Sequence, residues 1–255
     1  GGARDHLLGF RAVNGFGEAY KAGGKVVKNV TGFDLPKLMC GAMGTLGVLT
    51  EVTLRLVPAA PSMTLVVKSI SADEGFALLR RVWSSPLEAT GLAYIPDCAS
   101  GAFAELGALG SGASLIRLEG AAMPLKEKIA ALRTLSGKTE ALEIADGDAV
   151  FRKIGSGAAF VPHEFDIWRI AVPPSRAADV AHALGGTLWL ADWAGGLFWI
   201  GITDTDQTLA GTLRRIAART DGHARMMRAS PQTRADIAVF RPEDPASECL
   251  TRAVK

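Results

Sequence analysis

The amino-acid sequence predicts an α+β protein, and three observations support this fold class. Residues 1–60 alternate short apolar runs with glycine-rich turns, which is typical of a small β-rich layer. Pro58 and Pro61 enclose two alanines and indicate a linker. After this linker, the apolar pattern of strand, helix, strand, strand, helix, strand occurs twice, so a second and larger α+β part follows the first layer.

The composition is that of a folded chain with a sizeable core. The protein has 255 residues, of which 48% are hydrophobic and 21% are charged, and this excludes a disordered chain. The 28 basic and 26 acidic residues give a net charge of +2 without a basic stripe, which argues against electrostatic binding of nucleic acid. The three cysteines have no C-x-x-C spacing, so a reducing compartment fits better than a disulfide framework or a cysteine zinc site.

The first 60 residues are predicted to form a small sheet. Strands are predicted over residues 6–13, 17–22, 26–30 and 48–57, and one or two helical turns over residues 33–40. Asn14-Gly15 predicts a two-residue hairpin turn between the first two strands. We expect strands 7–13 and 48–57 to expose apolar surface, which would cause self-association of the chain.

The second part of the chain contains two similar patterns. The predicted strands are 63–70, 90–95, 114–118 and 139–144 in the first pattern, and 165–172, 187–191, 197–202 and 223–229 in the second. The helices begin at a capping box at Ser71 and near Pro124, and two further apolar stripes cover 177–184 and 209–216. Residues 185–202 are apolar, but Asp192 among them favours two strands over a transmembrane helix. Both patterns are β-α-β-β-α-β, which predicts two ferredoxin-like units over about 62–145 and 162–230, with helices on one face of an antiparallel sheet.

The segment 23–51 has the most chemical content. Its glycines at positions 41, 44 and 47 allow positive φ and close approach of the backbone to a ligand. Backbone amides in such a loop can hydrogen-bond a phosphate or a flavin edge; the alternative is that the glycines only turn the chain between two strands. The spacing matches neither the Walker loop nor the Rossmann G-x-G-x-x-G pattern, so the residues alone indicate a candidate ligand loop and nothing more specific.

Two motifs in this segment resemble a known family. The string K-N-V-T-G-F-D-L at residues 28–35, followed by G-A-M-G-T-L-G-V at 41–48, resembles the second half of the FAD-binding domain of FAD-linked oxidases of the vanillyl-alcohol oxidase type. With G-A-R-D-H-L-L-G-F-R-A-V-N-G before them at 2–15, the chain most closely resembles the FAD-binding E subunits of bacterial glycolate oxidases. The resemblance is strong over residues 1–60 and weaker over 220–245.

This resemblance implies a domain organisation and a cofactor. Residues 1–60 would be the C-terminal part of a PCMH-type FAD-binding domain, residues 61–230 a cap of two ferredoxin-like (βαββαβ) units, and residues 231–255 a C-terminal segment. The cofactor would be FAD. Relative to the family, the chain lacks the segment with the pyrophosphate loop, which would precede residue 1, and the C-terminal tail, which would follow residue 255. We therefore expect a fragment that binds FAD weakly or not at all.

The resemblance also implies which residues line the flavin. These are Lys28, Asn29, Thr31, Gly32 and Asp34 in the first motif, and Gly44, Thr45, Leu46, Gly47 and Val48 in the second. Structural roles stay open beside this interpretation. Asp34 is a candidate helix cap, Lys28 a candidate solvated residue, and Leu46 and Val48 are candidate core residues.

The sequence assigns neither a metal site nor a catalytic residue. The four histidines contain no i,i+2 or i,i+4 pair. Related catalytic subunits that oxidise D-2-hydroxy acids carry a paired-histidine motif, and its absence here argues against a stand-alone hydroxy acid oxidase. His223 and Arg228 enclose the last predicted strand, where a structural role and a flavin-facing role are both open.

The resemblance therefore implies an oxidoreductase that is inactive as an isolated chain. The leading interpretation is the FAD-binding subunit of a glycolate oxidase-like complex, which oxidises a 2-hydroxy acid with flavin and transfers electrons to partner subunits. The expected partners are a catalytic flavin subunit and an iron–sulfur subunit. The expected location is the cytoplasm, with peripheral attachment to the inner membrane through these partners. The alternative is a non-catalytic assembly subunit with a vestigial flavin site.

Overall fold

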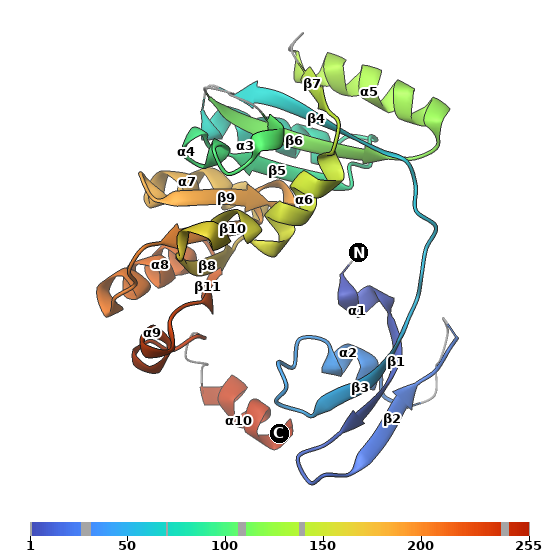
Figure 1. The fold of residues 1–255 in the computed structure, drawn as a ribbon, viewed down its shortest axis with the longest axis vertical. Coiled ribbons are helices and arrows are strands. Elements are labelled where there is room, and N and C mark those ends of the chain that lie inside the picture. Colours follow the sequence, from blue (N-terminus) through green and yellow to red (C-terminus); the bar gives the residue numbers. More distant parts are fainter. Residues whose placement is uncertain are drawn as a thin grey trace. The chain divides into compact units, whose positions relative to one another are not determined.

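Two antiparallel sheets organise the chain, one of three strands and one of eight (Figure 1). The computed structural model describes residues 2–26, 32–69, 71–106, 111–137, 141–240 and 245–254. The three-stranded sheet belongs to unit 1, which consists of Gly1–Ala59 and Glu243–Lys255, and the eight-stranded sheet belongs to unit 2, which is Ala60–Pro242. The predicted α+β class with antiparallel sheets is confirmed.

Unit 1 is a small sheet with short helices. Its strand order is β2 (Ala19–Gly23), β1 (Leu7–Val13) and β3 (Val48–Leu54), and its helices are α1 (Ala3–His6), α2 (Leu35–Met39) and α10 (Pro245–Val254). The buried core is Phe10, Ala12 and Met39, with the Tyr20 ring edge-on to Phe10 at 5.6 Å between centroids. Of the predicted strand over 26–30, residues 27–30 lie outside the described residues.

The predicted two-residue turn at Asn14-Gly15 is wrong. Strand β1 ends at Val13 and β2 begins at Ala19, so residues 14–18 form a longer loop. The Asn14 Oδ1 atom accepts hydrogen bonds from the amides of Phe16 at 3.0 Å and Glu18 at 2.9 Å. The Asn14 side chain thus pairs with two backbone amides of the loop and stabilises this longer connection in place of a two-residue turn.

The two strands predicted to expose apolar surface differ from one another. On the edge strand β3, Val52 is 48% exposed and Leu54 is 51% exposed, as predicted. On the central strand β1, Leu7, Phe10 and Ala12 are buried, so the expectation of an exposed surface there is wrong. The physical reason is that β1 pairs with strands on both sides and packs against α2.

Unit 2 contains the two predicted β-α-β-β-α-β patterns. The first consists of β4 (Ser62–Ser69), α3 (Ala72–Trp83), β5 (Gly91–Ile95), β6 (Gly112–Glu119), α5 (Ala122–Ser136) and β7 (Ala141–Ile144). The second consists of β8 (Asp166–Ala171), α7 (Ala177–Leu184), β9 (Leu188–Asp192), β10 (Leu197–Ile202), α8 (Gln207–Arg219) and β11 (His223–Arg228). The sheet order β11-β8-β10-β9-β5-β6-β4-β7 joins the two four-stranded halves through β9 and β5. The predicted tandem of ferredoxin-like units is therefore present.

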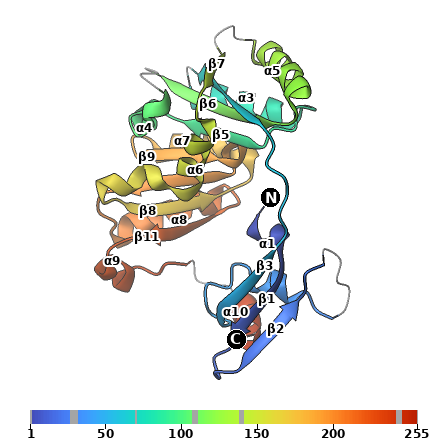
Figure 2. The same cartoon turned by 45° about the vertical axis from the view of Figure 1, so that its right-hand side comes forward.

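The expectation that helices cover only one face of this sheet is wrong (Figure 2). Helices α3, α5, α7 and α8 bury the first face, to which Leu65 and Val67 of β4 contribute. On the second face, Val66 of β4 packs with Val150 and Ile154 of α6 (Gly147–Ser156). That face is also covered by α4 (Asp97–Ser100) and by the 3₁₀ helices η1 (Ala104–Leu106) and η2 (Ala158–His163). Because strand side chains alternate between faces, an apolar second face needs a cover of its own.

Local signals begin and end the elements as expected at several points. The Ser71 hydroxyl accepts a hydrogen bond from the Glu74 amide at 3.2 Å and caps α3.

Residues 231–255, predicted as one C-terminal segment, contain α9 (Pro231–Asp236) in unit 2 and α10 in unit 1. Among the described residues, none of the helices has the length and apolar character needed to cross a bilayer.

Phe76→Ala tests the core between the helices and the sheet of unit 2. Phe76 is fully buried, so we expect its truncation to lower the free energy of unfolding by about 3–5 kcal/mol. Trp83 lies in the same helix and is 66% exposed, so Trp83→Ala is the matched control with an expected change within about 0.5 kcal/mol. Urea denaturation followed by circular dichroism measures both, and equal costs would contradict this assignment of the core.

Val52→Lys tests whether the exposed apolar strand β3 drives self-association. An exposed edge strand with apolar side chains promotes pairing between chains, and a lysine on it opposes such pairing. We expect the wild-type chain to associate as its concentration rises and Val52→Lys to shift it toward the monomer in analytical ultracentrifugation. Trp83→Lys, which places the same charge at an exposed apolar position of unit 2, should leave the association unchanged. A wild-type chain that stays monomeric throughout would refute the prediction.

Candidate functional site

Helix α2 is held at its start by Asp34, one of the predicted site residues. The Asp34 Oδ1 atom accepts a hydrogen bond from the Lys37 amide at 3.2 Å, and Oδ2 lies 2.8 Å from Lys37 Nζ. Pro36 in the first turn has the φ that a helix start requires. The hydrogen bond from the Lys37 side chain is the largest cause of the lowered pKa of Asp34; burial opposes it, and the backbone bond and the charge of Lys37 add smaller effects that lower the pKa. Asp34 is therefore a helix cap and an ion-pair partner.

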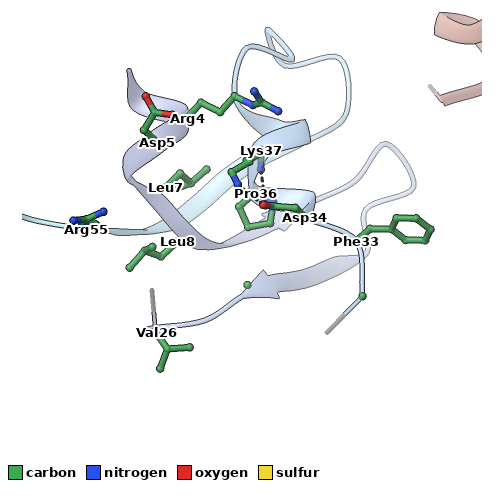
Figure 3. A pocket seen from close by; sticks show the side chains of 12 residues that line it. Arg4, Asp5, Leu7, Leu8, Val26, Phe33, Asp34, Pro36, Lys37 and Arg55 are labelled. Carbon is green, nitrogen blue, oxygen red and sulfur yellow. Dashed lines mark hydrogen bonds and ion pairs between the residues drawn. The ribbon is translucent and has the colours of Figure 1, made fainter. Parts of the chain in front are cut away.

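A pocket of about 240 Å³ lies beside the first turn of α2 (Figure 3). We call it the Asp34 pocket, and its lining residues are Arg4, Asp5, Leu7, Leu8, Gly23, Val26, Gly32, Phe33, Asp34, Pro36, Lys37 and Arg55. Three cationic and two acidic side chains line it, so the pocket has a small excess of positive charge. Sequence reasoning missed Arg4 and Arg55, because they reach this pocket only through the packing of α1 and of the segment that follows β3.

A second pocket of about 350 Å³ lies beside the last turn of α2. We call it the Leu46 pocket, and its lining residues are Leu38, Cys40, Gly41, Ala42, Thr45, Leu46, Leu250 and Thr251. Thr45 closes a tight turn there, since its hydroxyl donates to the Ala42 carbonyl at 2.6 Å and its amide to the same carbonyl at 2.9 Å. The two pockets thus lie at the two ends of one short helix.

Two glycines of the loop between α2 and β3 have different reasons to be glycine. Gly47 has a φ of +148°, and a Cβ there would lie 2.7 Å from the Val13 carbonyl oxygen. The close approach of this residue to β1 therefore leaves no room for a side chain. Gly44 has a φ of +77° and open space on the side where a Cβ would lie. Gly44 is needed for the backbone conformation alone, and its open side leaves room for a ligand to approach the backbone.

The structure divides the predicted site residues between several places. Gly32 and Asp34 line the Asp34 pocket, and Thr45 and Leu46 line the Leu46 pocket. Gly44 and Gly47 lie in the adjoining loop, and Val48 is exposed at the start of β3. Lys28, Asn29 and Thr31 lie outside the described residues.

These pockets fit part of an FAD molecule. Pockets that bury a small ligand measure about 300–1,000 Å³, and the two here measure about 240 and 350 Å³. Beside the Leu46 pocket, the open side of Gly44 leaves room for a phosphate or a flavin edge to approach the backbone. The cationic side chains of the Asp34 pocket favour an anionic group. FAD has both an aromatic end and a pyrophosphate, so each pocket matches one kind of group that it contains.

In unit 2, the residues considered from the sequence lie on the surface. His223 is exposed at the start of β11 and Arg228 is exposed at its end. The His182 Nε2 atom lies 2.9 Å from Asp73 Oδ2 and links α7 to α3. Within the described ranges, no group of three or more His, Cys, Asp or Glu residues has an arrangement that could hold a metal ion.

Comparison with known proteins gives relatives for most of the chain, although no family model matches it. The chain is 32% identical over 224 residues to the glycolate oxidase subunit GlcE of Escherichia coli strain K12, which covers 88% of this chain and 55% of that protein. It is 43% identical over 58 residues to the glycolate oxidase subunit GlcD of Bacillus subtilis strain 168, which covers 23% of this chain and 12% of that protein. The chain thus spans about half the length of the first of these relatives.

Solved structures share the fold. An alkyldihydroxyacetonephosphate synthase aligns with a TM-score of 0.59 at 14% identity over 86% of this chain and 49% of its own. A 4-ethylphenol oxidase from Gulosibacter chungangensis aligns with a TM-score of 0.54 at 13% identity over 85% of this chain and 57% of its own. The chain is therefore similar in sequence to glycolate oxidase subunits, and it shares its fold with these solved structures.

Proposed function

We propose that this protein is the FAD-binding subunit of a glycolate oxidase-like complex. The observation that carries the proposal is the similarity over 224 residues to a glycolate oxidase subunit, which extends through both units and is not limited to the motifs. The reaction would be the flavin-dependent oxidation of a 2-hydroxy acid. The partners would be a catalytic flavin subunit and an iron–sulfur subunit, and the location would be the cytoplasm, with attachment to the inner membrane through these partners.

Unit 1 supplies the residues that would hold the cofactor. In this proposal one end of FAD lies against the open backbone at Gly44, beside Thr45 and Leu46, and Gly32 and Asp34 lie where the Asp34 pocket receives another part. Arg4 in that pocket would balance negative charge of the cofactor. When bound, the flavin supplies the capacity to accept a hydride equivalent, and the protein supplies position and electrostatics.

The complex can be tested with the chain in its native source. We expect a tagged copy to co-purify with a second flavoprotein and an iron–sulfur protein, and the purified assembly to reduce an artificial electron acceptor when glycolate is added. Recovery of the chain without any such partner would refute the proposal.

A second candidate is a non-catalytic assembly subunit with a vestigial flavin site. The division of the predicted flavin residues between two small pockets favours it. This candidate predicts the same partners, but an assembly whose glycolate-dependent reduction does not change when Gly44 is replaced. The Gly44 variant therefore separates the two candidates.

Gly44→Ala tests the flavin role of the loop in the isolated chain. Because neither pocket is large enough for the whole cofactor, we expect FAD to bind with a Kd above about 1 μM. Alanine at a φ of +77° is strained, and we expect a further loss of about fivefold or more in affinity. Gly17→Ala, at a φ of +80° in the hairpin loop, is the matched control and should not change the affinity. Flavin fluorescence titration measures both.

Either of two results would contradict this prediction. Stoichiometric yellow flavin in the purified chain would show that binding is tight. Equal affinities of the Gly44→Ala and Gly17→Ala variants would show that the loop does not contact the cofactor.

Lys37→Gln tests how Asp34 is held ionised. The Lys37 side chain is the largest cause of the lowered pKa of Asp34, so its removal should return that pKa toward the ordinary value of 3.8. Because the folded pKa is the lower one, stability from this pair is present above the ordinary pKa and is lost as the pH falls through the folded pKa. Carboxyl titration by NMR measures the shift, with Lys21→Gln on β2 as control. An unchanged titration of Asp34 in Lys37→Gln would show that the ion pair is not its cause.

A further inference from the structure

Polar side chains gather near the starts of β4 and α6, on the second face of the sheet in unit 2. Thr64 of β4 lies opposite Arg117 of β6 on one side and opposite Ile144 of β7 on the other. By the alternation along β4, Ser62 and Thr64 share a face with Val66, which packs against α6. A pocket of about 320 Å³ lies at this corner of the sheet. We call it the Asp146 pocket, and its lining residues are Ala60, Pro61, Ser62, Thr64, Ile144, Ala145, Asp146, Gly147 and Asp148.

The Asp146 pocket carries negative charge. Among the described residues that line it, the charged ones are Asp146 and Asp148. Arg117 lies beside the pocket with its Nε atom 3.0 Å from Asp148 Oδ1, but the same guanidinium also pairs with Glu119. The three carboxylates and one guanidinium leave an excess of two negative charges at this corner. An excess of this size matches a divalent cation.

One oxygen of each aspartate already has a partner inside the protein. The Asp146 Oδ1 atom accepts a hydrogen bond from the Ala149 amide at 2.9 Å and caps α6. The Asp148 Oδ1 atom accepts one from the Ser62 hydroxyl, also at 2.9 Å. In the part of the chain that the structure describes, neither Oδ2 atom has a hydrogen bond or an ion pair. Two carboxylate oxygens are therefore available to a ligand in the pocket.

The Thr64 hydroxyl is a buried polar group without a partner. Thr64 is 1% exposed, and its Oγ1 atom has no hydrogen bond to any described residue. This hydroxyl faces the start of α6, because a Cβ at Gly147 would overlap Oγ1, and both residues line the pocket. A buried hydroxyl without a partner costs free energy. A ligand in the pocket that binds the hydroxyl oxygen would recover this free energy.

An anion is the alternative ligand, because the start of a helix attracts negative charge. In the Asp146 pocket an anion would lie against two carboxylates. Their full charges outweigh the partial positive charge of the α6 terminus, which is about half an elementary charge. The side-chain donors are carboxylate and hydroxyl oxygens, which are the ligands of hard cations such as Ca²⁺ and Mg²⁺. The lining thus favours a cation.

We propose that the Asp146 pocket binds a hard divalent cation, with Ca²⁺ preferred over Mg²⁺. Its ligands are the Oδ2 atoms of Asp146 and Asp148 and the hydroxyl oxygen of Thr64, and water completes the shell. Ca²⁺ accepts an irregular set of about six to eight oxygens, whereas Mg²⁺ demands a near-ideal octahedron. The bound ion holds the start of α6 against β4 and against the residues through which the chain enters unit 2.

Calorimetric titration of the full chain with CaCl₂, after treatment with EDTA, tests the proposal. Two carboxylates make a weaker site than three or more would, so we expect a Kd of about 0.1–1 mM for Ca²⁺ and weaker binding of Mg²⁺. Asp146→Asn keeps the cap of α6 and removes one charge, and it should weaken Ca²⁺ binding about tenfold. Asp206→Asn is the matched control, because Asp206 caps α8 through the Leu209 amide and lies outside the pocket. This variant should bind Ca²⁺ as the wild type does.

Thr64→Val distinguishes a metal ligand from a structural hydroxyl. Valine has nearly the shape of threonine and leaves no unpaired polar atom, so the variant should melt at a higher temperature than wild type when both are in EDTA. The same variant should bind Ca²⁺ about fivefold more weakly, because one oxygen ligand is lost. A hydroxyl with a purely structural role would give a lower melting temperature and unchanged Ca²⁺ binding.

Three results would overturn the proposal. These are no saturable heat from wild-type protein up to about 20 mM CaCl₂, equal affinities of Asp146→Asn and Asp206→Asn for Ca²⁺, or tighter binding of sodium phosphate than of Ca²⁺. Circular dichroism identifies a variant that has not folded, and Thr64→Val keeps the test valid if Asp146→Asn is such a variant. The Asp146 pocket belongs to unit 2 and the flavin motifs to unit 1, so these results are independent of the proposed function.

Discussion

Buried aromatic rings pack across the junction between the two halves of the eight-stranded sheet and hold these halves together. The backbone contributes little there, since β5 and β9 share a single paired position, Tyr94 opposite Ala191. The rings of Phe76, Tyr94, Trp189 and Phe198 lie with centroids 5.2–6.4 Å apart and come from both halves. The backbone around them is constrained in turn. A Cβ at Gly75 or Gly112 would overlap Tyr94, and one at Gly195 would lie 3.0 Å from Phe76. The positions of α3, β6 and the β9–β10 turn therefore depend on this cluster.

Unit 1 has a much smaller core, and it is the unit that carries the family motifs. Its core cluster is Phe10, Ala12 and Met39, whereas unit 2 buries an apolar layer on each face of its sheet. Regions with few buried apolar contacts open at a low free energy. A ligand that binds only the folded state stabilises it by mass action. The loop at Gly44 therefore belongs to the unit with the smaller core, which a bound ligand or partner would stabilise.

The order of elements in unit 2 could be predicted because each has its own local signal, such as the Ser71 cap and the apolar stripe that follows it. Helix α6 was missed although Asp146 caps it and Val150 and Ile154 give it an apolar stripe. These residues fall between the two predicted repeats, where the sequence pattern predicts no element. The family motifs indicated Asp34 and Thr45, but not that they line different pockets. Such groupings arise from packing between distant segments, which no local pattern encodes.

The mirrored strand order gives unit 2 the character of a fused dimer. Equivalent strands, β5 and β9, meet at the junction, as the same surface patch meets itself across a two-fold axis in an isologous pair of subunits. Two separate copies would have to share one sequence, so that any substitution would appear twice. Covalent fusion removes that requirement. In the first half, α6 covers Val66 on the second face, whereas in the second half the same face carries Arg169. Each half can thus change the residues on this face without a matching change in the other.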